Sequence, residues 1–190
     1  MRKLIVSMNV TLNGCMAGPN GELDWHYNLW GEDMARATAL QLSRADTLLF
    51  GRKTYEAMAS YWVAKANNVF GSRRDDDLVD MMNNCNKVVF SKTLHTTRWQ
   101  NSRLAQKTLA GEIKALKQGD GKDILVYGSG RLVKALDKHG LIDEYRLWVH
   151  PVVVDGGKPL FGGSQKLRLV GQEAFETGVV LMAYTTCLRK

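Results

Sequence analysis

Cysteine is scarce in this sequence: Cys15, Cys85 and Cys187 are the only three among 190 residues, and no C-x-x-C pair occurs. An odd, widely spaced set of cysteines does not provide a disulfide framework, and the missing pairs argue against a zinc ribbon. We therefore expect free thiols, as in a cytoplasmic protein, and no metal site.

Long hydrophobic runs are also missing, because no apolar stretch of the sequence approaches the ~20 residues that a membrane-spanning helix needs. Near the N-terminus, the polar residues Asn9, Thr11 and Asn13 alternate with apolar ones and interrupt the apolar core that a signal peptide requires. This alternation predicts a first strand, and a protein that stays in the cytoplasm and away from membranes.

Basic residues outnumber acidic ones and give a net charge of +7, but no run of five or more lysines and arginines occurs. The excess of positive charge favours an anionic partner. Because the cations are not clustered and no aromatic stacking platform is evident, we do not expect that partner to be nucleic acid. The remaining candidates for the anionic partner are a phosphorylated metabolite and a dinucleotide.

Strand-like and helix-like segments alternate over the first three-quarters of the chain. Apolar runs predict strands over residues 3–10, 45–50, 87–91 and 122–128. Helical patterns are found over residues 32–44, 52–62, 75–84, 107–119 and 129–140. From residue 142 onward, three β-rich runs are separated by turn glycines. We predict one α/β domain, residues 1–190, with a mostly parallel mixed sheet, an antiparallel C-terminal hairpin and helices on both faces.

The segment ILVYGSGRLVK, residues 124–134, places a Gly-Ser-Gly between a strand pattern and a helix pattern. Chains hold phosphate groups with this arrangement. The third glycine of the Rossmann fingerprint is missing, since Val133 takes its place, and the later part of the chain turns antiparallel. The motif therefore indicates a phosphate site but not a Rossmann domain.

Two further predicted strands end in groups that bind phosphate. The segment from Gly51 to Thr54 joins a glycine, two cations and a hydroxyl at a helix start, and Ser91 and Lys92 follow the next strand. Ligands of open α/β sheets bind at the carboxyl ends of the strands, so three such ends predict one long anionic ligand. Taken singly, each is equally explained by capping residues and solvated charges.

In this order and spacing, the chain resembles the dihydrofolate reductase-like superfamily, and most closely the reductase domain of bifunctional riboflavin biosynthesis proteins and its stand-alone relatives. The resemblance covers nearly the whole chain and is carried by the segments SMNVTLNGCMAGPNGELDW, LLFGRKTYEAM, VVFSKTL, ILVYGSGRLVKAL, LIDEYRLWVHPVVVDGGKPLF and VVLMAYT. The H-x-E and C-x-x-C motifs of a zinc deaminase are missing, so the resemblance extends to the reductase half alone.

The resemblance implies that NADPH lies across the carboxyl edge of the sheet. A 2′-phosphate requires cations, and no acidic residue follows the strand that ends at Ser91, which favours NADPH over NADH. The implied cofactor residues are Gly51, Arg52, Lys53 and Thr54 at the phosphates, Ser91 and Lys92 at the 2′-phosphate, Gly128, Ser129, Gly130, Arg131 and Leu132 at the pyrophosphate, and Val10, Met16, Ala17 and Gly18 at the nicotinamide.

For the substrate side, the resemblance suggests a carboxylate on the helix after the first loop, and Asp33 is the candidate catalytic residue and proton donor. Its offset from Gly51 does not match the dihydrofolate reductases cleanly. An acidic residue in the first helical turn also suits the helix dipole, so both explanations remain open.

Other residues are candidates for binding the substrate. Trp25 and Trp30 are candidates for the walls of an aromatic cleft, although packing explains them equally well. Lys158 and Arg36 are candidates for a substrate phosphate. We interpret His150, within a β-rich run, as structural.

The resemblance implies an NADPH-dependent reductase similar to 5-amino-6-(5-phosphoribosylamino)uracil reductase, which transfers a hydride to a pyrimidine- or pterin-type substrate or its sugar adduct. The alternatives are a dihydrofolate or pterin reductase and a non-catalytic NADPH-binding sensor. The expected partners are a small heterocyclic substrate and, as in relatives of this type, a second copy in a homodimer.

Overall fold

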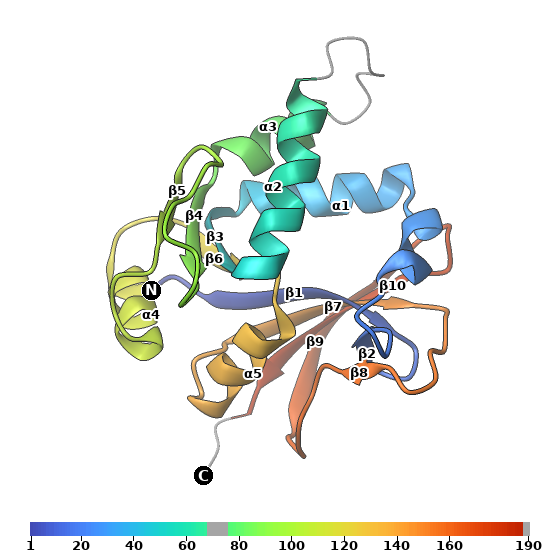
Figure 1. The fold of residues 1–190 in the computed structure, drawn as a ribbon. Helices are drawn as coiled ribbons and strands as arrows, with labels where there is room; N and C mark the ends of the chain where they lie inside the picture. Colours follow the sequence, from blue (N-terminus) through green and yellow to red (C-terminus); the bar gives the residue numbers. More distant parts are fainter. Residues whose placement is uncertain (68–75, 188–190) are drawn as a thin grey trace.

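A computed structural model describes residues 1–67 and 76–187 of the chain, and Figure 1 shows its helices and strands. The main sheet has eight strands in the order β5-β4-β3-β6-β1-β7-β10-β9. These strands are β1 (Leu4–Thr11), β3 (Ala45–Gly51), β4 (Asn86–Phe90), β5 (Ser102–Leu104), β6 (Asp123–Val126), β7 (Glu144–His150), β9 (Leu167–Ala174) and β10 (Val180–Thr186). The short strands β2 (Cys15–Ala17) and β8 (Lys158–Pro159) form a second sheet.

The direction of the strands follows the sequence prediction. The pairs β1–β6, β1–β7, β3–β4, β3–β6 and β4–β5 are parallel, whereas β10 is antiparallel to both β7 and β9. The expected mostly parallel sheet with an antiparallel C-terminal hairpin is therefore confirmed. The short strands β2, β5 and β8 were not predicted.

Helices cover both faces of the sheet, as expected (Figure 1). The helices are α1 (Glu32–Ser43), α2 (Arg52–Ala66), α3 (Asp76–Asn84), α4 (Leu109–Gln118) and α5 (Gly130–Lys138), and a 3-10 helix η1 (Asp24–Leu29) precedes α1. The first three pack on one face, and α4 and α5 pack on the other. The predicted start of α3 at residue 75 lies outside the described residues. In the described ranges, no helix has the length and hydrophobicity to cross a membrane.

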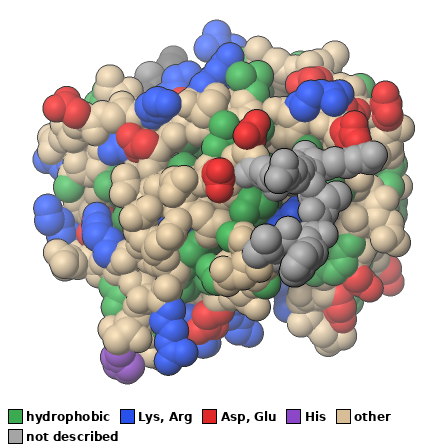
Figure 2. Space-filling model, turned by 90° about the horizontal axis from the view of Figure 1, so that it is seen from above, with side chains coloured by type: hydrophobic (Ala, Val, Ile, Leu, Met, Phe, Trp, Pro, Cys, Tyr) green, Lys and Arg blue, Asp and Glu red, His purple; other side chains and the backbone are tan. Residues whose placement is uncertain are grey.

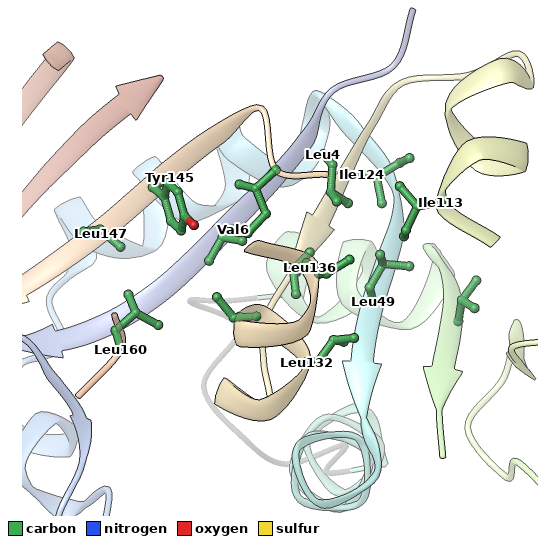
Figure 3. Close-up of a cluster of buried hydrophobic side chains, with 14 of the residues drawn as sticks. Leu4, Val6, Leu49, Ile113, Ile124, Leu132, Leu136, Tyr145, Leu147 and Leu160 are labelled. Carbon is green, nitrogen blue, oxygen red and sulfur yellow. The ribbon is translucent and has the colours of Figure 1, made fainter. Parts of the chain in front are cut away.

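The core beneath α5 fixes where that helix begins. Leu132 and Leu136 on α5 pack against Val6 and Leu49 of the sheet, and all four side chains are buried (Figure 3). Each buried leucine stabilises the fold by roughly 1.5–3 kcal/mol. This packing holds the first turn of α5 at the carboxyl end of β6.

The core on the other face fixes α2 in the same way. Phe50 of β3 packs with Tyr55 of α2 and Trp99, and all three are buried. The Tyr55 hydroxyl also accepts a hydrogen bond of 2.9 Å from the Trp99 backbone N–H. The first turn of α2 is therefore held at the carboxyl end of β3.

A lysine is buried in the α2–α3 face. Lys87 of β4 is 1% exposed, and its Nζ atom donates to the backbone oxygens of Asn83 at 2.8 Å, Cys85 at 2.7 Å and Gln100 at 3.3 Å. It also lies 4.4 Å from the centroid of the Trp99 ring, which is a cation–π distance. Because Asn83 belongs to the last turn of α3, the ammonium group satisfies carbonyls that the helix end leaves without partners.

Replacing this lysine with an apolar residue of similar length removes three donors and leaves buried carbonyls unsatisfied. We expect Lys87→Met to lower the free energy of unfolding by about 2–3 kcal/mol, measured by urea denaturation. The matched control is Lys114→Met on the exposed side of α4, which should change the free energy of unfolding by less than about 0.5 kcal/mol. Equal effects of the two substitutions would show that the carbonyl contacts do not stabilise the fold.

Candidate active site at the carboxyl edge of the sheet

Four neighbouring parallel strands end at the same edge of the sheet. In the order β4-β3-β6-β1, they end at Phe90, Gly51, Val126 and Thr11. The three segments with phosphate-binding character directly follow the first three of these ends. The structure therefore brings them to one edge, whereas their role in binding stays a prediction.

Two turns at this edge touch each other. The Gly51 backbone N–H donates to the Gly128 carbonyl at 2.8 Å. A Cβ atom on Gly51 would lie 2.5 Å from the Ser129 Oγ atom and 3.2 Å from its backbone nitrogen, and one on Gly128 would lie 3.3 Å from Thr54 Oγ1. Gly128 also has a φ of +113°, which a residue with a side chain rarely adopts. Glycine is required here so that the two turns can approach.

Two helix N-termini, those of α2 and α5, start from these turns without side-chain caps. Gly51 and Ser129 are the residues before α2 and α5, and neither makes a capping hydrogen bond through a side chain. By contrast, Thr108 caps α4 by accepting from the Gly111 N–H. The free N–H groups and the helix dipoles of α2 and α5 therefore favour an anion at this edge.

Cationic side chains surround the two helix starts. Lys53 and Arg131 are exposed on the first turns of α2 and α5, and Lys92 is exposed beyond β4. Arg52 is also exposed and pairs with Glu56, one turn later on the same helix, at 3.3 Å. Exposed pairs of this kind contribute little, so Arg52 is available to a phosphate.

Two of the predicted cofactor residues have structural tasks. The Ser91 hydroxyl accepts hydrogen bonds from the backbone N–H groups of Thr93 and Leu94, at 3.1 and 2.9 Å. The Leu132 side chain is buried in the core, so only its backbone N–H faces the helix start.

The residues predicted to meet the nicotinamide come from β1 and β2. Val10 is buried at the end of β1, and Ala17 and Gly18 are buried at the end of β2. Met16 lies over the first turn of α5, because a Cβ atom on Gly130 would be 2.0 Å from its sulfur. The structure thus places the β2 loop on the glycine turn of α5.

Asp33 occupies a different position. Its carboxylate oxygens accept hydrogen bonds of 2.8 Å each from the backbone N–H groups of Met34 and of Glu176, the latter in the turn between β9 and β10. The hydrogen bond from Glu176 is the main cause of the lowered pKa of Asp33. A carboxyl group with a lowered pKa is ionised at neutral pH and has no proton to donate. These contacts therefore do not favour a role for Asp33 as general acid. The catalytic role of Asp33 stays a prediction.

An aromatic cluster lies at the ends of β1 and β7. His150 is 1% exposed, and its Nε2 atom is 3.2 Å from the Asn9 side-chain oxygen. Trp25 and His26 of η1 cover its ring, with centroids 5.2 and 5.7 Å away. Burial, and secondarily the neighbouring His26, lower the pKa of His150 to about 4. Its Nδ1 atom is buried and has no hydrogen-bond partner.

Sequence reasoning did not bring these aromatic residues together. The interpretation of His150 as structural accounts for its bond to Asn9 but not for its unpartnered nitrogen. Of the predicted aromatic walls, Trp25 packs on His150, whereas Trp30 is 47% exposed. Lys158 on β8 and Arg36 on α1 are both exposed. Among the described residues, no group of three or more His, Cys, Asp or Glu side chains is arranged to hold a metal ion.

Two proteins of Bacillus subtilis are similar to this chain. YyaP of Bacillus subtilis is 34% identical over 186 residues, which cover 96% of this chain and 94% of that protein. YwjB of the same organism is 29% identical and covers 95% of this chain and 96% of that protein. Both relatives match along essentially their full length.

Solved structures share the fold. A protein from Shewanella sp. PV-4, assigned by name to riboflavin biosynthesis, is similar with a TM-score of 0.72 and 22% identity, covering 97% of this chain and 99% of that chain. The deaminase/5-amino-6-(5-phosphoribosylamino)uracil reductase of Thermotoga maritima is similar with a TM-score of 0.65 and 15% identity. The match covers 98% of this chain and 57% of the Thermotoga maritima chain.

The RibD C-terminal domain family model matches residues 2–181. This match extends over β1 to the first part of β10 and so includes the whole carboxyl edge described above. The chain therefore belongs to the RibD C-terminal domain family, a family of reductases.

Proposed function

We propose that residues 1–190 act as one domain, an NADPH-dependent reductase of a pyrimidine- or pterin-type heterocycle or its sugar adduct. A compound such as 5-amino-6-(5-phosphoribosylamino)uracil, which is named in the Thermotoga maritima relative, is the reference substrate. The observation that carries the proposal is the contact between the two uncapped helix starts at Gly51 and Gly128. Membership of a reductase family supports it.

The two helix starts suit a pyrophosphate. The N–H groups of the first turns of α2 and α5 converge from opposite faces of the sheet, so both dipoles favour the same anion. Thr54 adds a hydroxyl beside Gly128, and Arg52, Lys53 and Arg131 add charge. We assign the phosphates of the cofactor to this group of residues.

The end of β4 suits a 2′-phosphate. Lys92 is exposed there, and the residues that follow β4 include no carboxylate before residue 112. A site for NADH would instead offer an acidic residue to the ribose hydroxyl. We therefore assign Ser91, through its backbone, and Lys92 to the 2′-phosphate.

The remaining edge suits the reacting ring. When bound, a nicotinamide cofactor supplies the hydride. Val10, Met16, Ala17 and Gly18 would bind and orient the ring against the end of β1, and the β2 loop would exclude water from it. We therefore assign the end of β1, the strand next to β6 in the sheet, to hydride transfer.

We propose that the chain forms a homodimer, which the exposure of the C-terminal hairpin supports. All residues of β9 after its first are exposed, and β9 is an edge strand with unpaired backbone groups. On the α1 side, Val170 and Leu40 are 49% and 55% exposed. A second copy that packs its own hairpin against this one would cover this face and the strand edge, as edge strands commonly require. The three free cysteines also suit an enzyme of the cytoplasm.

The proposed function is tested by binding and turnover. We expect the protein to be retained on a 2′,5′-ADP resin and to oxidise NADPH, followed at 340 nm, when 5-amino-6-(5-phosphoribosylamino)uracil is added. Arg52→Ala should weaken retention about tenfold, since it removes a phosphate contact. Dihydrofolate as the better substrate would favour the pterin reductase, and NADPH binding without turnover would assign a sensor. Failure of both binding and turnover would exclude the proposal.

The glycine contact gives a more specific prediction. In Gly51→Ala, the added methyl group would force the two turns apart, and we expect the dissociation constant for NADPH to rise about tenfold, or ~1.4 kcal/mol. Gly163→Ala is the matched control, because nothing lies within 4 Å of a Cβ atom at that position. Titration of protein fluorescence with NADPH measures both. Equal affinities would remove the glycine turns from the cofactor site.

The dimer has its own test. We expect the 21.3 kDa chain to sediment at about twice its mass. Val170→Lys should yield monomers, because it introduces a charge on the exposed hairpin face. Val153→Lys is the control, since Val153 is 66% exposed in the loop after β7. A wild-type monomer would contradict the proposed assembly and leave the reductase proposal intact.

A further inference from the structure

A buried nitrogen without a partner is the strongest unexplained feature of the site. The Nδ1 atom of His150 has no hydrogen-bond partner, and the residue is 1% exposed. Leaving a buried polar atom unpaired costs about 1–3 kcal/mol. Native structures rarely retain such an atom unless a ligand or water pairs with it.

The neighbouring amide determines which kind of ligand fits. The Nε2 atom of His150 is 3.2 Å from the Asn9 Oδ1 atom. An amide oxygen only accepts hydrogen bonds, so Nε2 carries the hydrogen and Nδ1 of the neutral ring has a free lone pair. Nδ1 is therefore an acceptor that requires an N–H or O–H donor.

The surroundings keep the ring neutral. Burial is the main cause of the pKa of about 4 for His150, and the neighbouring His26 adds to it. In the described part of the chain, the titratable groups near it come from η1: His26 itself, with Asp24 and Tyr27 beside that residue. The sheet contributes Asn9, whose amide does not titrate. At pH 7, His150 accepts a hydrogen bond and does not act as a cation.

The cover over the His150 ring is aromatic. Trp25 meets the His150 ring edge to face, with an interplanar angle of 83°, and His26 meets it at 47°. Both residues belong to η1, a 3-10 helix of which no residue is buried. A segment with so few buried contacts is displaced at small cost in free energy, and a flat ligand can then take its place beside the ring.

The position of His150 relates it to the predicted hydride transfer. In the register of the sheet, His150 is paired with Thr11, and its neighbour Val149 is paired with Val10. Val10 is one of the residues assigned to the nicotinamide. Because side chains alternate along a strand, Val10 faces the core beneath α5 whereas His150 and Asn9 face the α1 side. A heterocycle that reaches Nδ1 would therefore lie on the α1 side of the sheet edge, next to the strand end assigned to the nicotinamide.

We propose that His150 is a specificity-determining residue, whose Nδ1 atom accepts a hydrogen bond from a ring N–H of a flat nitrogen heterocycle once Trp25 and His26 move aside. This inference rests on the proposed reductase function and narrows its substrate to heterocycles with an N–H donor edge. Asn9 is the positioning residue, because its oxygen holds the ring in the required tautomer.

The test compares two probes in the presence of NADP⁺. 5,6-Diaminouracil has ring N–H donors, whereas its 1,3-dimethyl derivative lacks them. We expect wild-type protein to bind the first about tenfold more tightly, as is typical of one buried hydrogen bond. His150→Phe, which cannot accept, should lose this preference. His150→Gln, which retains an acceptor oxygen, should recover part of it.

The control and the contrary outcomes separate the inference from the proposed function. His139→Phe, at an exposed position after α5, should keep the full preference. An unchanged preference in His150→Phe, with NADPH affinity intact as evidence of folding, would overturn the inference. Failure of both probes to bind wild-type protein that binds NADPH would also overturn it and leave the cofactor site standing. Failure to bind NADPH would instead remove the proposed function.

A second readout observes the His150 ring directly. In protein with ¹⁵N-labelled histidine, we expect the NMR signal of His150 to show the neutral Nε2–H tautomer at pH 7, and the Nδ1 signal to shift when 5,6-diaminouracil is added. We also expect the affinity for this probe to be constant from pH 8 to pH 6, since the ring is already neutral. A proton on Nδ1, or binding that strengthens as the ring becomes protonated, would overturn the inference.

Discussion

The site depends on two strand-to-helix turns that touch with no side chain between them. The hydrogen bond from Gly51 to Gly128 joins the end of β3 to the end of β6, and a single methyl group at Gly51 would meet Ser129. Because α2 and α5 lie on opposite faces of the sheet, only contact at the edge can bring their first turns together. In the proposed cofactor site, the backbone, more than any side chain, therefore sets where an anion would bind.

Most of this edge was predictable from the sequence, since its signals are local. Apolar runs that stop at Gly51 and at Gly128 predict a strand followed by a helix, and this prediction needs only the neighbouring residues. The antiparallel direction of the last hairpin also follows from its turn glycines. The order of the strands in the sheet was not predicted, and it departs from chain order. What periodicity does not provide is the distance between the turns, which the packing of Leu132 and Tyr55 determines.

The proposed substrate side was less predictable because its contacts join distant parts of the chain. The bond between Asn9 and His150 spans 141 residues, and that between Asp33 and Glu176 spans 143. The sequence around Asp33 does not distinguish between three roles: capping a helix, holding the β9–β10 turn and donating a proton. Only the tertiary structure shows that both of its oxygens already accept backbone hydrogen bonds.

The first strand connects the two sides of the site. Its even-numbered residues Val6 and Val10 face the core beneath α5, while Ser7 and Asn9 point to the α1 face, where they bond Gln41 and His150. The alternation of polar and apolar residues that argues against a signal peptide thus has a structural consequence. It lets one strand complete the hydrophobic core on one face and present hydrogen-bonding groups on the other, at the edge where we propose that the substrate binds.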